Sequence, residues 1–180
     1  MNNMPAKTQL SAALTLLALL AGCATLDKNE CLRADWYAVG LEDGARGQPV
    51  ERLGHHRRAC AEHGITPQTE RYLAGRNEGL KSFCTYDRGV SVGRSGQSYS
   101  AVCPDNLAGR FSAGYQIGKE IHDLRRRLDT VQEQIRKSKA ALTAGIPNPK
   151  ARAAEVERLE DLARESEQLE NRITTLEARS

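Results

Sequence analysis

Residues 117–142, IGKEIHDLRRRLDTVQEQIRKSKAAL, decide the fold of the second half of this chain. Their apolar side chains recur at alternating spacings of four and three, with Ser138 as the interruption. The apolar positions are Ile117, Ile121, Leu124, Leu128, Val131, Ile135 and Leu142. This heptad period is typical of an α-helix that buries one stripe of its surface against another helix. The stretch therefore predicts a long helix with a coiled-coil seam.

A second seam follows a break at residues 145–149, where two prolines block continuation of the helix. Its positions are Leu159, Leu162, Ser166, Leu169, Ile173 and Leu176. Residues 119–139 hold seven basic and four acidic side chains, whereas residues 150–179 hold six basic and eight acidic ones. Because the two arms carry opposite net charges, we expect an antiparallel coiled-coil hairpin over residues 107–180. Arms of about 30 residues would form a rod of roughly 45 Å.

The N-terminus has the pattern of an export signal. Lys7 precedes a short apolar run at residues 14–19, and Leu20-Ala21-Gly22-Cys23 follows. The run is too short to cross roughly 30 Å of hydrocarbon as a helix. We therefore predict a signal peptide over residues 1–22 with a lipobox, and a lipid on Cys23. An ordinary secretory signal with an incidental cysteine is the alternative. Similarity to Gram-negative lipoproteins with a residue such as Ala24 after the cysteine implies the outer membrane, facing the periplasm.

The other four cysteines lie in the predicted body, residues 23–106. Disulfides are expected in an exported protein. Three pairings are possible. Helices predicted over residues 32–46, 50–63 and 67–83 bring Cys31 towards Cys60 and argue against a bond between Cys60 and Cys84, and a β-hairpin between Cys84 and Cys103 would bring its two ends together, so we expect Cys31 with Cys60 and Cys84 with Cys103. Between the last two cysteines, alternating apolar residues flank the turn at residues 93–96. This pattern predicts one short β-hairpin.

The body also contains a weak repeat in which an aromatic residue precedes two glycines four apart. Its three instances are Trp36 with Gly40 and Gly44, Tyr72 with Gly75 and Gly79, and Phe111 with Gly114 and Gly118. Two such glycines on one helical face allow a close approach of another helix. Tight helix packing is the favoured interpretation. A ligand groove over the first two instances is the alternative.

Three patterns could carry chemistry, and each has a simpler interpretation. Ser91 lies in Gly-x-Ser-x-Gly, but the flanking residues lack the strand and helix of a nucleophile elbow. His56, Cys60 and His63 share a helical face, yet a disulfide at Cys60 would remove one metal ligand, and a solvated basic face is preferred. The carboxylate of Asp43, like that of Glu78, is explained by a helical surface pattern. We therefore predict no catalytic residues, no metal and no cofactor.

Composition limits the possible partners. The chain has 180 residues and a formal net charge of +3 from 26 basic and 23 acidic residues. This mixed-sign balance disfavours nucleic-acid binding. Aromatic residues make up only 4% of the chain, so we expect a small core that the disulfides supplement.

A set of cysteines, glycines and aromatic residues over residues 31–118 resembles a known family. Its members are Cys31, Asp35, Trp36, Gly40, Asp43, Gly44, His56, Cys60, Tyr72, Gly75, Arg76, Gly79, Leu80, Phe83, Cys84, Gly89, Gly93, Gly96, Tyr99, Val102 and Cys103. The arrangement is similar to a proteobacterial lipoprotein family known as domain of unknown function 2799. The resemblance implies a location in the cell envelope and carries over no catalytic residues.

Together these patterns predict a mainly α-helical protein: a small disulfide-bonded body with one short β-hairpin, then the long helical hairpin. The expected function is that of a non-enzymatic, lipid-anchored envelope protein. Its hairpin would bind a partner, which could be another envelope protein or a second copy, or would span part of the periplasm. The alternative is a module that binds a small molecule or cell-wall fragment near Trp36 and Tyr72. A hydrolase acting through Ser91 is disfavoured.

Overall fold

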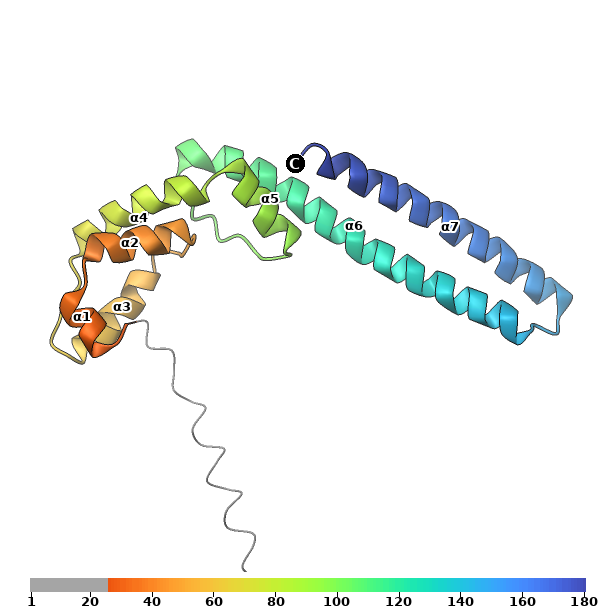
Figure 1. Cartoon of the computed structure of the whole chain (residues 1–180), viewed down its shortest axis with the longest axis horizontal. Coiled ribbons are helices and arrows are strands. Elements are labelled where there is room, and N and C mark those ends of the chain that lie inside the picture. The colour runs from red at the N-terminus through yellow and green to blue at the C-terminus, as the bar shows by residue number, and fades with distance from the viewer. Residues whose placement is uncertain (1–25) are drawn as a thin grey trace, which may run out of the picture.

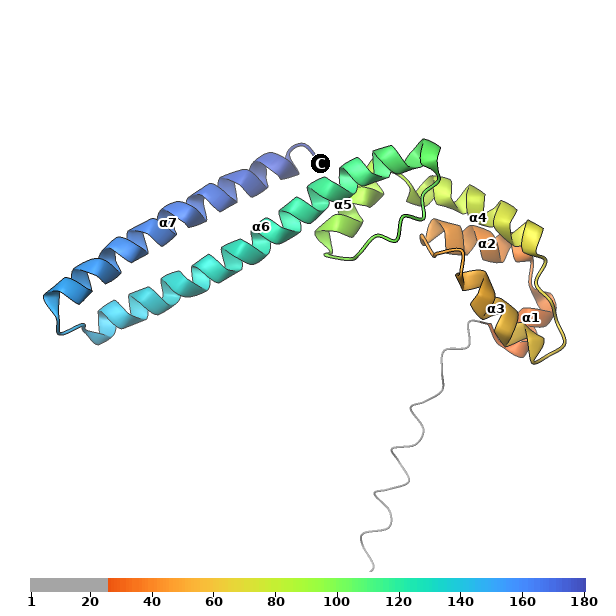
Figure 2. The same cartoon turned by 180° about the vertical axis from the view of Figure 1, so that it is seen from behind.

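The computed structural model describes residues 26–180, and the predicted signal peptide and Cys23 lie outside this range. The described part is entirely helical and contains no strand. Its helices are α1 (Lys28–Arg33), α2 (Trp36–Ala45), α3 (Arg52–Ala61), α4 (Thr69–Phe83), α5 (Tyr86–Arg94), α6 (Asp105–Ala144) and α7 (Pro149–Glu177). The molecule is elongated: α1 and α3 lie at one end, and the loop between α6 and α7 lies at the other (Figures 1 and 2).

Short polar side chains set the first helix boundaries. Asp27 and Glu30 form a capping box that starts α1. The Asp35 carboxylate accepts a hydrogen bond from the backbone N–H of Tyr37 at 3.0 Å and so begins α2. This cap divides the helix predicted over residues 32–46 into two. The predicted helices over residues 50–63 and 67–83 are present as the slightly shorter α3 and α4.

The body is built on two close pairs of parallel helices with glycines at their contacts. In the first pair, a Cβ atom on Gly40 would lie 2.0 Å from the backbone oxygen of Tyr72, and one on Gly75 would lie 2.0 Å from that of Tyr37. In such contacts the glycine Cα–H points at the opposite carbonyl oxygen. The main partner of α4 is therefore α2. The glycine repeat therefore serves tight helix packing, which confirms the favoured interpretation of the sequence.

The second pair, α5 with α6, corrects the predicted β-hairpin. Residues 86–94 are helical, and Cβ atoms on Gly89 and Gly93 would lie 2.2 and 2.3 Å from the backbone oxygens of Phe111 and Tyr115. Val90 and Val92 have the alternate spacing of a strand, but two apolar residues are too few to distinguish a strand from a helix. The spacing of four between the glycines is the informative period. The turn-like residues after Arg94 end the helix.

The two helix pairs form a tandem duplication. We call residues 31–83 the first unit and residues 84–122 the second unit. The first helix of each unit carries Tyr-x-x-Gly-x-x-x-Gly-x-x-Gly-Gln, at residues 37–48 and 86–97. The second helix carries Arg-aromatic-x-Ala-Gly-x-x-x-Gly, at residues 71–79 and 110–118. The repeat thus has four copies, one more than the three predicted above.

Disulfides occupy equivalent places in the two units. Cys31 is bonded to Cys60 and Cys84 to Cys103, with Cα–Cα distances of 5.5 and 5.7 Å. These are the two pairings favoured from the sequence. In each unit the bond joins the segments that precede the two parallel helices. The disulfide therefore holds the N-terminal ends of the two helices together, and the glycine contacts hold them together along the rest of their length.

The duplication extends to individual contacts after the first helix of each unit. Gly47 and Gly96 both have left-handed backbones, with φ of 69° and 72°. Cβ atoms there would meet the rings of Phe83 and His122, four residues beyond the last glycine of each second helix. A left-handed residue beneath a ring requires glycine. The segment after the helix is therefore held to its partner in the same way in both units.

The predicted helical hairpin is present as α6 packed against α7. α6 belongs both to the second unit and to the hairpin, because it contains Phe111 and Gly118 as well as the heptad seam. Asn148 caps α7, and Pro149 occupies its first turn. At the base, Glu177 of α7 accepts hydrogen bonds from Arg94 of α5, at 2.7 Å, and from Arg125. Within residues 26–180, no helix combines the length and apolar character needed to cross a membrane.

Candidate functional site

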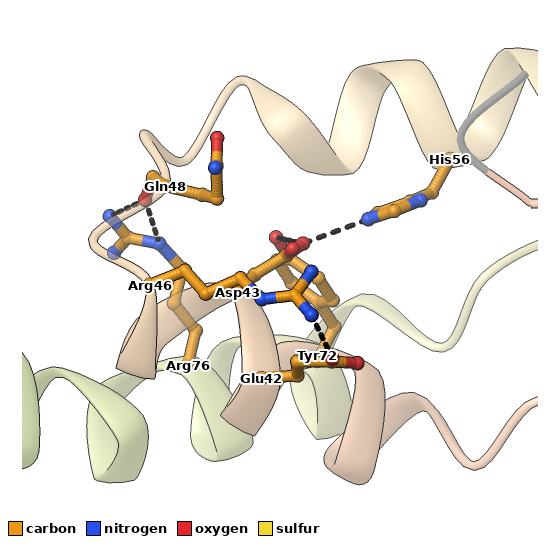
Figure 3. Close-up of polar contacts among 7 residues, drawn as sticks. All are labelled: Glu42, Asp43, Arg46, Gln48, His56, Tyr72 and Arg76. Carbon is orange, nitrogen blue, oxygen red and sulfur yellow. Dashed lines mark hydrogen bonds and ion pairs between the residues drawn. The ribbon is translucent and has the colours of Figure 1, made fainter. Parts of the chain in front are cut away.

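The buried polar cluster of the described chain joins the three longer helices of the first unit. Asp43 of α2 lies between His56 of α3 and Tyr72 of α4 (Figure 3). The Asp43 Oδ2 atom is 2.8 Å from the His56 Nε2 atom and accepts a 2.7 Å hydrogen bond from the Tyr72 hydroxyl. The exposed fractions are 7% for Asp43, 3% for His56 and 0% for Tyr72. This cluster, Asp43–His56–Tyr72, ties the crossover helix α3 to the glycine-packed pair.

The cluster holds its carboxylate ionised and its phenol protonated. Burial alone would raise the pKa of Asp43, but the hydrogen bonds from His56 and Tyr72 outweigh it, so the pKa lies below its ordinary value. Burial, and then the hydrogen bond to Asp43, raise the pKa of Tyr72 well above its ordinary value. The His56 Nδ1 atom is buried without a hydrogen-bond partner. Nε2 is therefore the His56 ring nitrogen that donates to Asp43.

The second unit fills the equivalent space with apolar groups. By the glycine register, Val92 corresponds to Asp43 and Phe111 corresponds to Tyr72. The aromatic ring from the crossover segment is Tyr99, whose centroid lies 4.5 Å from that of Phe111, whereas His56 meets Tyr72 at 5.9 Å. The fold of a unit therefore does not depend on a carboxylate at this position.

A second contact is polar in both units but uses different side chains. Arg76 donates from two nitrogens to the backbone oxygen of Gln48, at 2.8 and 3.2 Å. The equivalent Tyr115 donates its hydroxyl to the backbone oxygen of Gln97, at 3.1 Å. Each bond ties the turn after the first helix to the second helix. At these two positions the first unit has the charged side chains of Asp43 and Arg76, whereas the second unit has Val92 and Tyr115.

The geometry of the cluster favours a structural role, in which it holds α2, α3 and α4 together, over a catalytic one. A general base must reach a proton on a substrate. The Tyr72 hydroxyl and the Asp43 carboxylate, which could exchange protons, are hydrogen-bonded to each other and shielded from solvent. Sequence reasoning had assigned Asp43 to an exposed helix surface and His56 to a solvated basic face, and both assignments are wrong. Glu78, in contrast, is exposed and pairs with Lys81.

The predicted ligand groove is closed. The face of Gly40 and Gly44 is covered by the backbone of α4, and that of Gly75 and Gly79 by the backbone of α2. Trp36 packs in a core cluster whose other buried members are Cys31, Leu53, Cys60 and Tyr72. The six residues proposed to line a groove are therefore brought together, but as packed protein interior without an opening at the glycines. Each glycine lacks a side chain because a backbone occupies that space.

The structure also fails to assemble the two other patterns that could carry chemistry, the possible metal ligands and the serine motif. Cys60 is disulfide-bonded, His56 is engaged by Asp43 and His63 is exposed, so these three residues do not converge on a metal site. Across residues 26–180, no cluster of three or more metal-ligating side chains is found. Ser91 is exposed in the middle of α5 and is therefore not on a strand-to-helix turn.

The hairpin offers a candidate interaction surface. Several apolar residues of its seam are only half-buried by the two helices: Leu124, Leu128, Ile135, Leu142, Leu159 and Leu169. Ser138 is buried in the seam, where it replaces an apolar residue, and Ser166 is half-buried. Val156 on α7 is 40% exposed. Two helices alone thus leave part of this apolar stripe in contact with solvent, as the heptad pattern predicts.

These features define an all-helical, disulfide-bonded protein with a duplicated body and a projecting helical hairpin. The chain belongs to the family described as "Protein of unknown function (DUF2799)", whose family model matches residues 35–120. The match begins at the cap of α2 and ends just after Gly118, so it covers the glycine-packed helices of both units and leaves most of the hairpin outside.

One relative is an uncharacterized protein, YfiL, of Escherichia coli (strain K12). The two chains are 33% identical over 92 residues, which is 49% of this chain and 71% of the relative. No solved structure matches the chain.

Proposed function

We propose that this chain is a cell-envelope lipoprotein that is exported, lipid-modified at Cys23 and non-enzymatic, and that it presents its helical hairpin to a partner. The disulfides support export, because such bonds persist in oxidising compartments outside the cytoplasm. The sequence around Cys23 supports the lipid anchor, and Ala24 favours the outer membrane, facing the periplasm.

The observation that carries the proposal is the position of the hairpin relative to the anchor. The first described helix, α1, begins at Lys28, four residues after Ala24. Residues 24–27 can span at most about 14 Å when extended. α1 lies at the opposite end of the molecule from the loop at residues 145–148 (Figure 1). A lipid at Cys23 would thus hold the first unit at the membrane and leave the hairpin directed away from it.

The anchor is tested separately from the hairpin. In the native host, the wild-type protein should take up labelled fatty acid and fractionate with membranes. The Cys23→Ser variant should lose the label and keep its signal peptide, because cleavage before residue 23 requires the lipid-modified cysteine, and all four remaining cysteines should still be bonded. Unprocessed protein in the cytoplasm, or four reactive thiols, would contradict the proposal.

The docking role is tested by photocrosslinking in cells. A photoreactive amino acid at Leu159 or Lys139 should give discrete adducts, whereas the same group at the exposed Arg33 of α1 should not. Arg33 is a suitable control because it is exposed and lies on α1, at the opposite end of the molecule from the loop between α6 and α7 (Figure 1). The absence of adducts at both hairpin positions would refute a docking role for this surface.

A further inference from the structure

The hairpin has two halves that differ in their ion pairs. In the half nearest the body, ion pairs cross between the helices: Glu120 with Arg172 at 2.8 Å, Arg127 with Glu165 at 2.7 Å, and Arg125 with Glu177. We call residues 131–163 the distal half. The ion pairs found there within the described chain stay inside one helix, where Glu133 meets Arg136 and Lys137, and Asp161 pairs with its near neighbour Arg164.

A groove between the two helices begins in the distal half and continues along α7 to Glu170. Ile135, Leu159 and Ala163 supply its apolar side chains. The other lining residues are polar or charged, and they are mainly acidic groups of α7: Glu160, Glu167 and Glu170, with Ser166 and Lys139. The groove therefore fits an amphipathic helix that bears basic residues beside an apolar stripe.

This chain itself contains such a helix. α6 holds eight basic and five acidic residues, whereas α7 holds five basic and eight acidic ones. Three of the basic residues of α6, namely Arg136, Lys137 and Lys139, lie at the level of the groove and are exposed. A twofold axis through this level would place the basic side of α6 in one copy against the acidic side of α7 in the other.

We propose that the distal half is a dimerisation surface on which a second copy of this chain packs side by side to form a four-helix bundle. The inference rests on the proposed docking role of the hairpin and names its occupant. The second copy covers the half-buried Ile135 and Leu159. It also supplies partners for Glu160, Glu167 and Glu170, for which no ion pair is found among residues 26–180. A twofold arrangement makes each contact twice, so weak contacts are doubled.

The test is a pair of charge-reversed variants that repair each other. For analytical ultracentrifugation, residues 1–22 are replaced by a secretory signal that is cleaved without lipid modification, and Cys23 is replaced by serine, so that the exported chain carries no lipid. One variant carries Lys137→Glu with Lys139→Glu, and the other carries Glu160→Lys with Glu167→Lys. Either variant alone opposes like charges across the interface, and we expect its dimer dissociation constant to rise about tenfold or more. An equimolar mixture of the two variants restores both attractive contacts and should dimerise like the wild type.

A control changes the net charge without touching the hairpin. Lys28→Glu with Arg33→Glu alters α1 at the opposite end and should leave dimerisation unchanged, and circular dichroism verifies the helical content of every variant. A wild-type chain that remains monomeric at all concentrations overturns the dimer. So does a mixture no more associated than its components. If adducts in cells then contain another protein, the docking role survives without the second copy; if neither a dimer nor an adduct is found, both proposals fail.

Discussion

The first and second units build the same parallel helix pair around different interiors. Both place glycines against the opposite backbone, and both join the ends of their helices by a disulfide. The first unit buries Asp43 between a histidine and a tyrosine, whereas the second buries Val92 near two aromatic rings. The shared features are therefore those that the fold requires. The polar cluster is an addition that selects one position for α3.

The units also differ at their C-terminal ends. The second helix of the first unit ends at Phe83, whose ring stacks on Phe111 at 5.1 Å and so joins the two units. The second helix of the second unit continues as α6 and becomes the hairpin. Duplication thus accounts for the body, and extension of its last helix accounts for the hairpin. The family match, which ends near residue 120, agrees with this division.

Substitution of the glycines that both units share should cause the largest loss of stability. Gly75→Leu in the first unit and Gly114→Leu in the second would drive a side chain into a backbone oxygen 2.0 or 2.1 Å from the new Cβ atom. Each substitution should reduce the free energy of unfolding by several kcal/mol, because the helices must separate. Chemical denaturation followed by circular dichroism measures the loss.

Gly109→Ala is the matched control for these substitutions. Gly109 lies in α6, and no heavy atom would meet its Cβ within 4 Å. Because alanine favours a helix, this variant should be more stable than the wild type by up to about 1 kcal/mol. If Gly75→Leu or Gly114→Leu were tolerated as well as Gly109→Ala, the close backbone contacts would not be what holds the pairs together.

Removal of either disulfide should have the next largest effect. The double substitutions Cys31→Ala with Cys60→Ala, and Cys84→Ala with Cys103→Ala, should each cost about 2–4 kcal/mol. The sequence separations are 29 and 19 residues, so loop entropy predicts a slightly larger cost in the first unit. Urea titration of both variants provides the comparison. A much larger cost in the second unit would show that its interior depends on the bond more than its length suggests.

These features were predictable from the sequence to different degrees. The helical hairpin could be predicted because heptad spacing constrains it directly. Both disulfide pairings were predicted correctly, although the bond between Cys84 and Cys103 was inferred from a β-hairpin where the structure has α5. The fourth repeat was missed because Val90-Ser91-Val92 imitates a strand and Gly96 imitates the centre of a turn. Comparison of residues 37–48 with residues 86–97 carried the missing information, since five positions are identical at matching spacing.

The Asp43–His56–Tyr72 cluster could not be predicted in this way. Asp43 lies one residue before a glycine on a short helix, and its sequence neighbours do not reveal what α3 places opposite it. His56 stands next to another histidine and two arginines, all three of which are exposed. Which of four adjacent polar residues turns inward depends on the rotation of α3. That rotation follows from packing across the unit and not from local pattern.

Asp43→Val tests the difference between the two units directly. It introduces the residue of the second unit and leaves the Tyr72 hydroxyl and the His56 ring nitrogen without a partner, which should cost about 1–3 kcal/mol. Adding Tyr72→Phe removes one of these orphaned groups, so the double variant should regain part of the loss. Thermal denaturation measures both. Glu42→Val, at the exposed neighbouring position, should change stability by less than about 1 kcal/mol. An unchanged melting temperature for Asp43→Val would mean that the cluster contributes nothing to the first unit.

The smallest effect is expected from acid, which titrates the cluster without a mutation. Because folding lowers the pKa of Asp43, the stability that its ionised form contributes is present above the ordinary aspartate pKa and is lost as pH falls through the folded value. The single tryptophan, Trp36, is buried in the first unit, so its fluorescence reports that unit alone. Melting followed by Trp36 should therefore shift to lower temperature in acid by more than it does in Asp43→Asn, whose amide cannot be protonated in this range. The loss should be smaller than that caused by Asp43→Val, since a protonated Asp43 can still accept a hydrogen bond from Tyr72. Equal acid shifts in the wild type and Asp43→Asn would assign the effect to exposed carboxylates such as Asp35, whose pKa is also lowered, chiefly by a hydrogen bond from Arg71.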